Sequence, residues 1–440
     1  MENEKKKNII SRLPWRETIA FVIVACFMVL GLVAAAKIPR EKIIDNLTES
    51  AELYRRNDRF FWVIDGVWGS CIDWYADAVL LDMAYYYDDK NPLKSVMISE
   101  YYHNNHKTIN ESFHETVLYD KNPNKEYIRY WHGSLSIVRP MLKWFSVKTI
   151  YMINGVLLLM LFLIFSVLMI KRKLYLLLIG IVLGLISVDV WFVPESLEYT
   201  WNFLLLPVCT AITVIVSEKG RSSWYGVMFL CFGMLTNYFD FLTTETITFT
   251  IPVLVLLYIE KRRGAESSPV KLTFKTAVNW GIGYAGAWIL KWLLASIVLG
   301  ENVMPYVTGH ISERIGGVDE SITVGPIAFL AGAITRNLKC LFPFGYGTVG
   351  MLAGVLVVLL FSYMAFVYRG RDIDRKRVLL YLTIGLIPYF RYLVLHNHAY
   401  KHFFFTYRAQ AGTILALFLI LNELKVWDTF RRTRLHGKKA

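Results

Sequence analysis

Long apolar segments recur along this chain and fix its class of fold before any motif is considered. Each runs for about 18 to 23 residues, enough to cross the hydrocarbon core of a bilayer as an α-helix. Hydrophobic residues make up 55% of the chain and the mean hydropathy is +0.40, which excludes a soluble globule. We predict an all-α polytopic membrane protein with about ten transmembrane helices. The expected spans are 18–36, 149–170, 174–193, 200–217, 224–240, 242–259, 277–299, 346–368, 377–395 and 403–422.

The stretch 323–342 is apolar, but Arg336 and Lys339 interrupt it. A half-inserted or surface helix fits this pattern better than a full crossing. A further crossing would also move some of the basic clusters to the other side of the membrane. With about ten spans, every basic cluster faces the same side.

We predict that the protein lies in the plasma membrane. By the positive-inside rule the side with the basic clusters is cytoplasmic, so both termini are expected in the cytoplasm. The net charge of +13 is then mostly the charge of inner loops near membrane lipids, so it indicates no nucleic-acid partner. The predicted organisation is a cytoplasmic tail over 1–17, a first helix over 18–36, an extracytoplasmic loop over 37–148, a transmembrane bundle over 149–422 and a basic cytoplasmic tail over 423–440.

The long loop over 37–148 has an organisation of its own. Residues 41–56 carry apolar side chains at helical spacing, which predicts an amphipathic helix lying on the membrane surface. A second helix is expected over 73–87 for the same reason. Residues 88–128 are polar and rich in Asn, Lys, His and Tyr, which predicts irregular, solvent-facing structure.

The second helix carries the best candidates for catalytic acids. Asp73 and Asp77 are four residues apart, so a helix directs both carboxylates to one side. Such pairs often occur where a proton or a cation is handled. Asp65 lies just upstream and is a candidate for substrate binding. The alternative is that Asp65 and Asp73 only cap helices.

The end of the loop brings a second group of candidates: Trp131, His132 and Arg139. Aromatic rings beside polar donors suit the faces and hydroxyl edges of a sugar. Tyr130 and Trp131 could equally be interface anchors. Arg139 precedes the next span, where it would meet either a phosphate or lipid headgroups.

Short outer turns add further polar residues. Glu195 and Glu198 lie in one turn and Asp240 in another, where helix capping is the alternative to substrate binding. Lys291 lies inside a span, where an ionisable group is costly and suggests a functional site. Snorkelling is the competing explanation, and Asp189 is a possible partner.

The last outer turn is the densest in polar residues. Its histidines could suggest a metal, but their spacing lacks a clear carboxylate partner, so a divalent metal is only weakly indicated. A cationic pocket for the phosphate of a lipid substrate fits better. The candidates there are Arg391, His398, Lys401, Tyr407 and Arg408.

The stretches IDWYADAVLLD (72–82), RYWHGSLSIVRP (129–140) and NYFDFLT (237–243) are similar to those of bacterial membrane proteins of the GT-C type. The layout of one span, a long outer loop and then a bundle also resembles the GT-C superfamily of integral-membrane glycosyltransferases. Members of that superfamily often place an Asp-Glu pair directly after the first span. Here Lys37, Arg40, Glu41 and Asp45 occupy that place, so the base is expected at Asp73 or Asp77.

The resemblance implies an inverting hexosyl- or pentosyltransferase that builds cell-envelope polysaccharide or glycolipid. Its donor would be a sugar on a polyprenyl phosphate, and its acceptor an extracytoplasmic glycan or lipid. One carboxylate would act as general base, with cations stabilising the leaving phosphate, so no cofactor is firmly implied. The alternatives are a polysaccharide polymerase or ligase, and a non-enzymatic transporter of a lipid-linked substrate.

Overall fold

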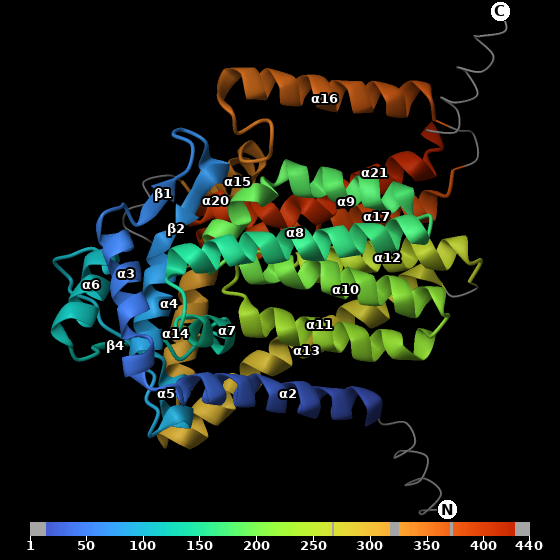
Figure 1. The fold of residues 1–440 in the computed structure, drawn as a ribbon. Helices are drawn as coiled ribbons and strands as arrows, with labels where there is room; N and C mark the ends of the chain where they lie inside the picture. Colours follow the sequence, from blue (N-terminus) through green and yellow to red (C-terminus); the bar gives the residue numbers. More distant parts are fainter. Residues whose placement is uncertain (1–14, 266–267, 317–324, 370–372, 427–440) are drawn as a thin grey trace, which may run out of the picture.

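The chain forms a bundle of long helices with a smaller helical domain at one end (Figure 1). The computed structural model describes residues 15–265, 268–316, 325–369 and 373–426. The domain is the part of the chain between the first two long helices, and we call its end of the bundle the domain end. The described chain begins and ends at the opposite end (Figure 1).

The class of fold is confirmed: the protein is helical and carries several helices of membrane-spanning character. Within the described residues, 7 helical segments are long and apolar enough to cross a membrane. They are α2 (Trp15–Ala36), α8 (Val147–Lys171), α10 (Thr200–Glu218), α13 (Pro269–Leu299), α16 (Gly347–Val367), α17 with α18 (Arg375–Gly385 and Ile387–Val394), and α20 with η5 and α21 (Phe403–Thr406, Tyr407–Gln410 and Ala411–Glu423).

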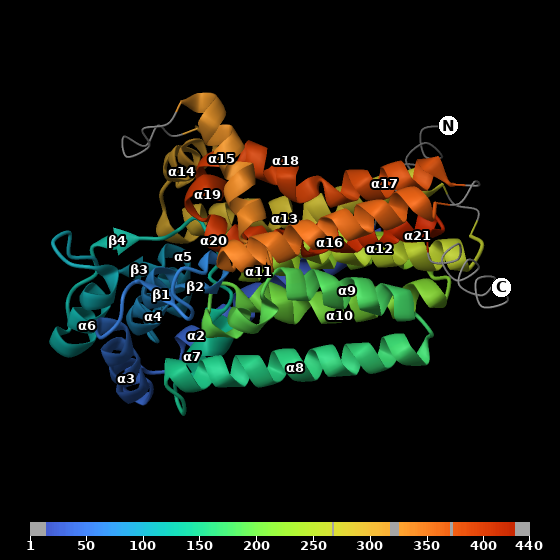
Figure 2. The same cartoon turned by 90° about the horizontal axis from the view of Figure 1, so that it is seen from above.

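The three other expected spans correspond to shorter helices. These are α9 (Tyr175–Ser187), which leads into η3 (Val190–Glu195), α11 (Tyr225–Phe239), which follows η4 (Ser222–Trp224), and α12 (Ile247–Arg262). They lie parallel to the long helices inside the bundle (Figures 1 and 2). The number of ten crossings therefore stays a prediction.

Three short helices gather at the domain end: α14 (Met304–Gly316), α15 (Pro326–Lys339) and α19 (His396–Lys401). The stretch expected not to cross the membrane contains α15, whose 14 residues span about 21 Å, short of a hydrocarbon core of about 30 Å.

The helices α11 and α13 are packed with their backbones in contact, because glycines face each other. A Cβ atom at Gly233 would overlap the carbonyl of Trp280, and one at Gly283 would overlap the carbonyl of Leu230. This contact fixes the rotation of α13 about its axis. Its aromatic residues are thereby directed toward one side of the bundle.

Basic turns lie side by side at the end away from the domain. Arg172, after α8, pairs with Glu218 at the end of α10 at 3.1 Å. Arg262 of α12 donates to the carbonyl of Arg172 at 3.1 Å, and Lys261 pairs with Glu423 of α21 at 2.5 Å. We call this end the basic end.

The domain consists of short helices and two small antiparallel sheets. The strands β1 and β2 pair with Phe60 opposite Asp73, and β3 and β4 pair with Glu100 opposite Glu126. The elements are η1 (Arg40–Lys42), α3 (Ile44–Arg55), β1 (Phe60–Trp62), η2 (Trp68–Ser70), β2 (Cys71–Asp73), α4 (Trp74–Tyr86), α5 (Pro92–Ile98), β3 (Glu100–Tyr101), α6 (Ile109–Tyr119), β4 (Lys125–Glu126) and α7 (Leu135–Met141).

The two helices predicted in the domain are present, but one prediction about their surroundings is wrong. Asp73 caps α4, as the sequence suggested. The helix α3 was expected to rest on the membrane with its apolar face. Instead Leu47, Ala51 and Tyr54 are fully buried, and α3 packs against α4 and α6. Its apolar face therefore belongs to the core of the domain.

The prediction of irregular structure over 88–128 is also wrong, because this stretch contains α5 and α6. Thr108 and Glu111 form a capping box that starts α6. Below this polar start, Ile109 and Phe113 are buried against the rest of the domain. Its polar residues are divided between the two sides: Asn110 is buried and donates to the carbonyl of Tyr54 at 3.1 Å, whereas Glu111 is exposed.

Candidate functional site

A polar cavity of about 380 Å³ lies between the domain and the domain end of the bundle. Its lining combines acids, imidazoles, cations and aromatic rings, and we call it the polar cavity. The acids are Asp73, Asp77 and Glu198; the imidazoles are His132, His398 and His402; the cations are Arg59 and Arg129; the rings are Phe60, Tyr75, Tyr101, Tyr127, Tyr130, Phe241 and Phe405.

Asp73 and Asp77 both line this cavity, as their spacing predicted. The carboxylate of Asp73 has fewer hydrogen-bond donors than that of Asp77. Its Oδ1 accepts from the backbone N–H of Ala76 at 3.1 Å. Burial raises the pKa of Asp73 to about 7. A carboxyl group with such a pKa can take up and release a proton near neutral pH.

Asp77 is held by donors from several elements. It accepts from the Tyr151 hydroxyl at 2.6 Å and from the backbone N–H groups of Leu197 and Glu198 at 2.8 and 3.1 Å. The Ser196 hydroxyl adds a fourth donor at 3.3 Å. Burial raises its pKa to about 7 as well. Because its oxygens are already engaged, Asp77 positions the turn that carries Glu198.

His132 provides a neutral imidazole in the cavity wall. Burial lowers its pKa to about 3, so the ring is uncharged at neutral pH. Its Nε2 lies 2.9 Å from the carbonyl of Tyr127, so this nitrogen carries the hydrogen and Nδ1 is an acceptor. Nδ1 is buried without a partner among the described residues. A substrate hydroxyl could donate to it.

The other two imidazoles come from the bundle. The rings of His398 and His402 are 4.7 Å apart. In the described ranges, no three His, Cys, Asp or Glu side chains are grouped so that they could hold a metal ion.

A second, apolar cavity of about 590 Å³ lies beside the first. One wall is a ladder of aromatic residues one turn apart on α13: Trp280, Tyr284, Trp288 and Trp292. Trp280 and Tyr284 are stacked with centroids 4.9 Å apart, and Trp288 and Trp292 are stacked at 5.9 Å. The helices α14 and α18 supply Val307, Ile311, Phe390 and Val394. We call this space the apolar cavity.

Arg129 and Tyr130 line both cavities, so the two spaces meet at these residues. The guanidinium of Arg129 lies 4.1 Å from the ring centroid of Tyr127, and Nη1 donates to the Tyr306 hydroxyl at 3.3 Å. Its Nε is buried without an acceptor among the described residues. None of the ion pairs in the described part of the chain involves Arg129. The junction therefore carries an uncompensated positive charge.

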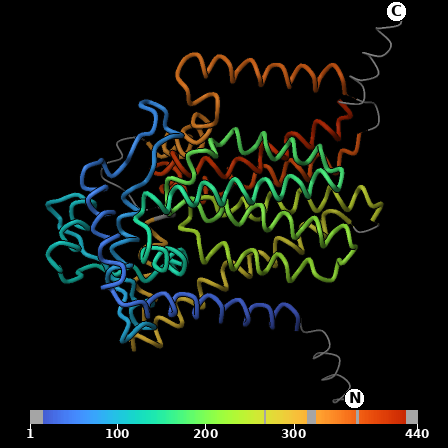
Figure 3. The backbone as a smooth tube through the Cα atoms, in the orientation of Figure 1, coloured from blue at the N-terminus to red at the C-terminus, as the bar shows by residue number. Residues whose placement is uncertain are grey.

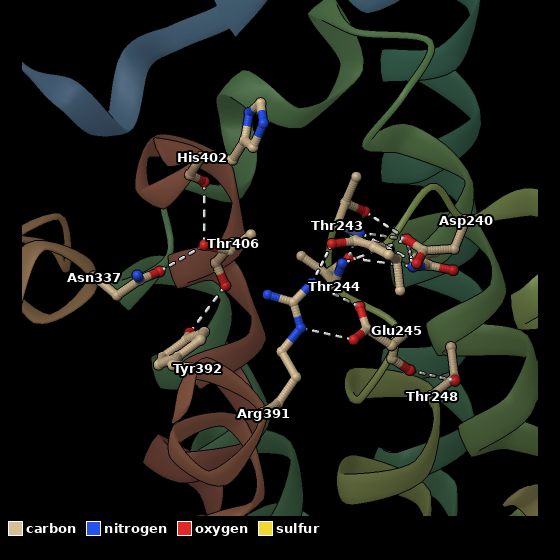
Figure 4. A network of polar contacts seen from close by, with 12 residues as sticks. Asp240, Thr243, Thr244, Glu245, Thr248, Asn337, Arg391, Tyr392, His402 and Thr406 are labelled. Atoms are coloured by element: carbon tan, nitrogen blue, oxygen red, sulfur yellow. Dashed lines mark hydrogen bonds and ion pairs between the residues drawn. The ribbon is translucent and has the colours of Figure 1, made fainter. Parts of the chain in front are cut away.

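A second cation in the apolar cavity is neutralised. Arg391 donates from Nε to Glu245 at 2.7 Å and from Nη2 to the carbonyl of Leu242 (Figure 4). Asp240 lies in the neighbouring network, where it accepts from Asn202 at 2.6 Å and from the hydroxyl of Thr243 at 2.5 Å (Figure 4). Asp240 lines neither cavity.

Arg139 was a candidate phosphate ligand, but in the structure it has a structural role. It is fully buried and donates to five backbone carbonyls, which are those of Ala35, Ala36, Ile38, Ala84 and Tyr87. Three of these acceptors lie at the end of α2 or just after it, and two belong to α4 and its end. Arg139 thus fastens α2 to the domain and is not free to bind a substrate.

We expect Arg139→Met to lower the melting temperature sharply or to prevent accumulation of the protein. The substitution removes a donor from five carbonyls, of which that of Ala35 keeps a second donor, the backbone N–H of Ile38 at 3.1 Å. The cost is about 1–3 kcal/mol for each buried group left unsatisfied. Thermal unfolding of the detergent-solubilised protein would measure the loss. Arg40→Met is the matched control, because Arg40 pairs with Asp120 at the surface and such pairs contribute little. Equal melting temperatures for the two variants would contradict this role.

Lys291 and Trp131 also have structural roles. Lys291 is fully buried and donates to the carbonyls of Val96 and Met97 at 2.9 and 3.0 Å. The indole of Trp131 donates to the carbonyl of Ala287 at 2.8 Å. Both residues join α13 to the domain, and neither lines a cavity. Asp189 is not the partner of Lys291.

Asp189 instead forms a buried cluster with Tyr407 near Arg408. The Tyr407 hydroxyl donates to Asp189 at 2.9 Å, and Arg408 donates to the carbonyls of Gly69 and Phe404. The remaining candidates also lie outside the polar cavity. Asp65 is exposed at the tip of a hairpin, Glu195 is half-buried beside Trp74, and Lys401 is half-buried at the end of α19.

Several cavity residues were not among the sequence candidates. Arg129 belongs to the same sequence motif as Trp131 and His132, so it could have been chosen as a candidate from the sequence. Tyr75 follows Asp73 and faces the cavity from the start of α4. Tyr101 and Tyr127 lie in a stretch expected to be irregular, and no pattern in the sequence connects them with α4.

Comparisons with protein-family models, with curated proteins and with solved structures found no match. The fold and the two cavities together define a helical membrane protein in which a polar cavity and an apolar cavity meet at Arg129 and Tyr130.

Proposed function

We propose that the protein is a membrane glycosyltransferase that moves a sugar from a polyprenyl-phosphate donor to an extracytoplasmic glycan or lipid acceptor. The observation that carries this proposal is the meeting of the polar and apolar cavities at Arg129 and Tyr130. Such a pair of spaces suits an amphiphile with an apolar chain, a single negative charge and a polar head. A sugar linked to a lipid phosphate has these three parts in this order.

The placement outside the cell follows from the basic end. Basic turns favour the cytoplasmic side, so the domain end and both cavities face the extracytoplasmic side. The described chain begins and ends at the basic end (Figure 1), which supports cytoplasmic termini in a plasma-membrane protein. The acceptor then reaches the polar cavity from outside.

The apolar cavity is suited to the prenyl chain. Its wall of aromatic rings on α13 offers flat faces to methyl-branched, unsaturated isoprene units. The phosphate would lie at the junction, where the guanidinium of Arg129 can donate charge-assisted hydrogen bonds. Arg391 is already paired with Glu245, so the charge available at the junction matches a phosphodiester with one negative charge.

The polar cavity is suited to the sugar and to the chemistry. Tyrosine and phenylalanine rings can stack on sugar faces, and His132 can accept from a hydroxyl. Asp73 takes the proton of the acceptor hydroxyl as its oxygen attacks the anomeric carbon from the face opposite the phosphate. A new C–O bond forms, the bond to the phosphate oxygen breaks, and the electron pair leaves with the lipid phosphate. Arg129 stabilises that negative charge, and the configuration at the anomeric carbon is inverted.

The same geometry supports a transferase over a transporter. The polar cavity is closed on one side by α4 and by Tyr101 and Tyr127 of the domain, and both cavities lie at the domain end. A polymerase or ligase would share these parts and differ only in its acceptor.

We expect activity to rise with pH through about 7. Asp73 must be ionised to accept a proton, and burial raises its pKa to about 7, so acidic solution protonates the base. A carboxyl group of ordinary pKa, about 4, would give a flat rate over the same range. Initial transfer rates in proteoliposomes over a pH series would measure this. A rate that stays constant from about pH 5 to 8 would contradict the assignment.

Binding of the lipid can be tested without knowing the sugar. Decaprenyl phosphate and decaprenol, which lacks the phosphate, would be compared as ligands of the purified protein by native mass spectrometry. We expect both lipids to bind and decaprenyl phosphate to bind more tightly, because only decaprenyl phosphate has a negatively charged group that can pair with Arg129. Equal affinity for the two lipids would contradict a phosphate site at the junction.

A further inference from the structure

The hairpin formed by β1 and β2 has a composition that is unusual for a segment exposed to water. Residues 60–72 read FFWVIDGVWGSCI, with Asp65 as the single charged residue. Val63, Ile64 and Trp68 are 37%, 42% and 45% exposed, so apolar side chains project from its tip. We call these three residues the hairpin tip.

Hydrogen bonds close the turn that carries the hairpin tip. The backbone N–H of Val67 donates to the carbonyl of Ile64 at 3.1 Å, and Gly66 has a φ of +79°, which a side chain would disfavour. The hydroxyl of Ser70 lies 3.0 Å from both the N and the O of Ile64, which ties the two strands together below the turn. The exposed side chains are therefore held in place rather than left on a loose loop.

The hairpin is fastened to the domain end of the last membrane-spanning segment. The ring of Trp68 lies 4.9 Å from that of Phe403, the first residue of α20. The carbonyl of Gly69 accepts from Arg408 at 2.8 Å. Figures 1 and 2 both show the hairpin beside the domain ends of α16 and α20. The tip thus lies beside the end of the last membrane-spanning segment.

We propose that the hairpin tip inserts into the headgroup region of the membrane leaflet at the domain end. Tryptophan and aliphatic side chains are favoured at this depth, where an apolar face meets a polar boundary. The occupant is lipid, because the tip continues the boundary formed by the ends of the membrane helices. The proposal does not depend on the proposed function. It has a consequence for the site, since β2 ends at Asp73 and lipid contact at the tip would steady the strand that carries it.

The test uses an environment-sensitive label at the tip of the full chain in lipid nanodiscs. Ile64→Cys would be labelled with a nitrobenzoxadiazole dye after Cys26 and Cys231, the cysteines that are not buried, are replaced by Ala. Leu118→Cys is the matched control, because Leu118 is 48% exposed on α6, within the domain. Val63→Cys takes the place of Ile64→Cys if the latter is unstable.

We expect the dye at residue 64 to emit at shorter wavelength than the dye at residue 118. Lipids that carry a doxyl quencher should quench the tip label strongly, whereas aqueous iodide should quench the control. Identical behaviour of the two labels would overturn the proposal. A blue shift without quenching by the lipid-borne quencher would also overturn it, because a protein partner or a second copy would then cover the tip.

Discussion

Replacing Asp73 by Asn is expected to lower the rate of sugar transfer by about 10²- to 10⁴-fold, the range in which a positioned general base contributes. Asn cannot accept a proton from the acceptor hydroxyl. It can still accept the hydrogen bond from Ala76, since Asn is as good an N-cap as Asp, so α4 should stay intact. Transfer would be followed by mass spectrometry of products in membrane vesicles that hold their own lipid-linked sugars.

Asp89→Asn is the control for this experiment. It removes the same charge from an exposed position of the domain that lines neither cavity, and it should leave the rate unchanged. The melting temperature of each variant would be measured alongside. A fully active Asp73→Asn protein would show that Asp73 is not the base.

The second large effect is expected for Arg129→Met. Loss of the guanidinium at the junction removes the charge that faces the leaving phosphate, and a single such donor contributes about 10²- to 10³-fold in rate. Binding should change in a specific way. The variant should still bind decaprenol, but it should no longer prefer decaprenyl phosphate, because the apolar cavity is unchanged while the charge is gone.

Lys94→Met is the matched control for net charge, because Lys94 is exposed on α5 and lines neither cavity. It should keep the preference for decaprenyl phosphate. If Arg129→Met keeps that preference too, the phosphate does not bind at the junction. If decaprenol binding is lost as well, the substitution has disturbed the cavity wall, and Arg129→Lys would decide between the two effects.

Hydropathy was sufficient to predict the helical membrane class of the fold, and local patterns predicted part of the site. Spans with long apolar runs are present as helices at the expected positions. The spacing of Asp73 and Asp77 predicted that both would face one space, because α4 is a regular helix with an N-cap. His132 and His398 also line the polar cavity.

The sequence was misleading for buried cationic side chains that donate hydrogen bonds to backbone carbonyls. Arg139, Lys291 and Arg408 were candidates for substrate binding, but each donates to carbonyl groups of other elements. A sequence does not show which carbonyls remain without partners until the fold places them.

The most direct test of the transferase is the composition of surface glycans in cells with and without the protein, measured by mass spectrometry. The account predicts that one sugar disappears when the protein is absent. The wild type and the Asp89→Asn variant should restore that sugar, and the Asp73→Asn variant should not. An unchanged glycan profile in cells that lack the protein would contradict the account.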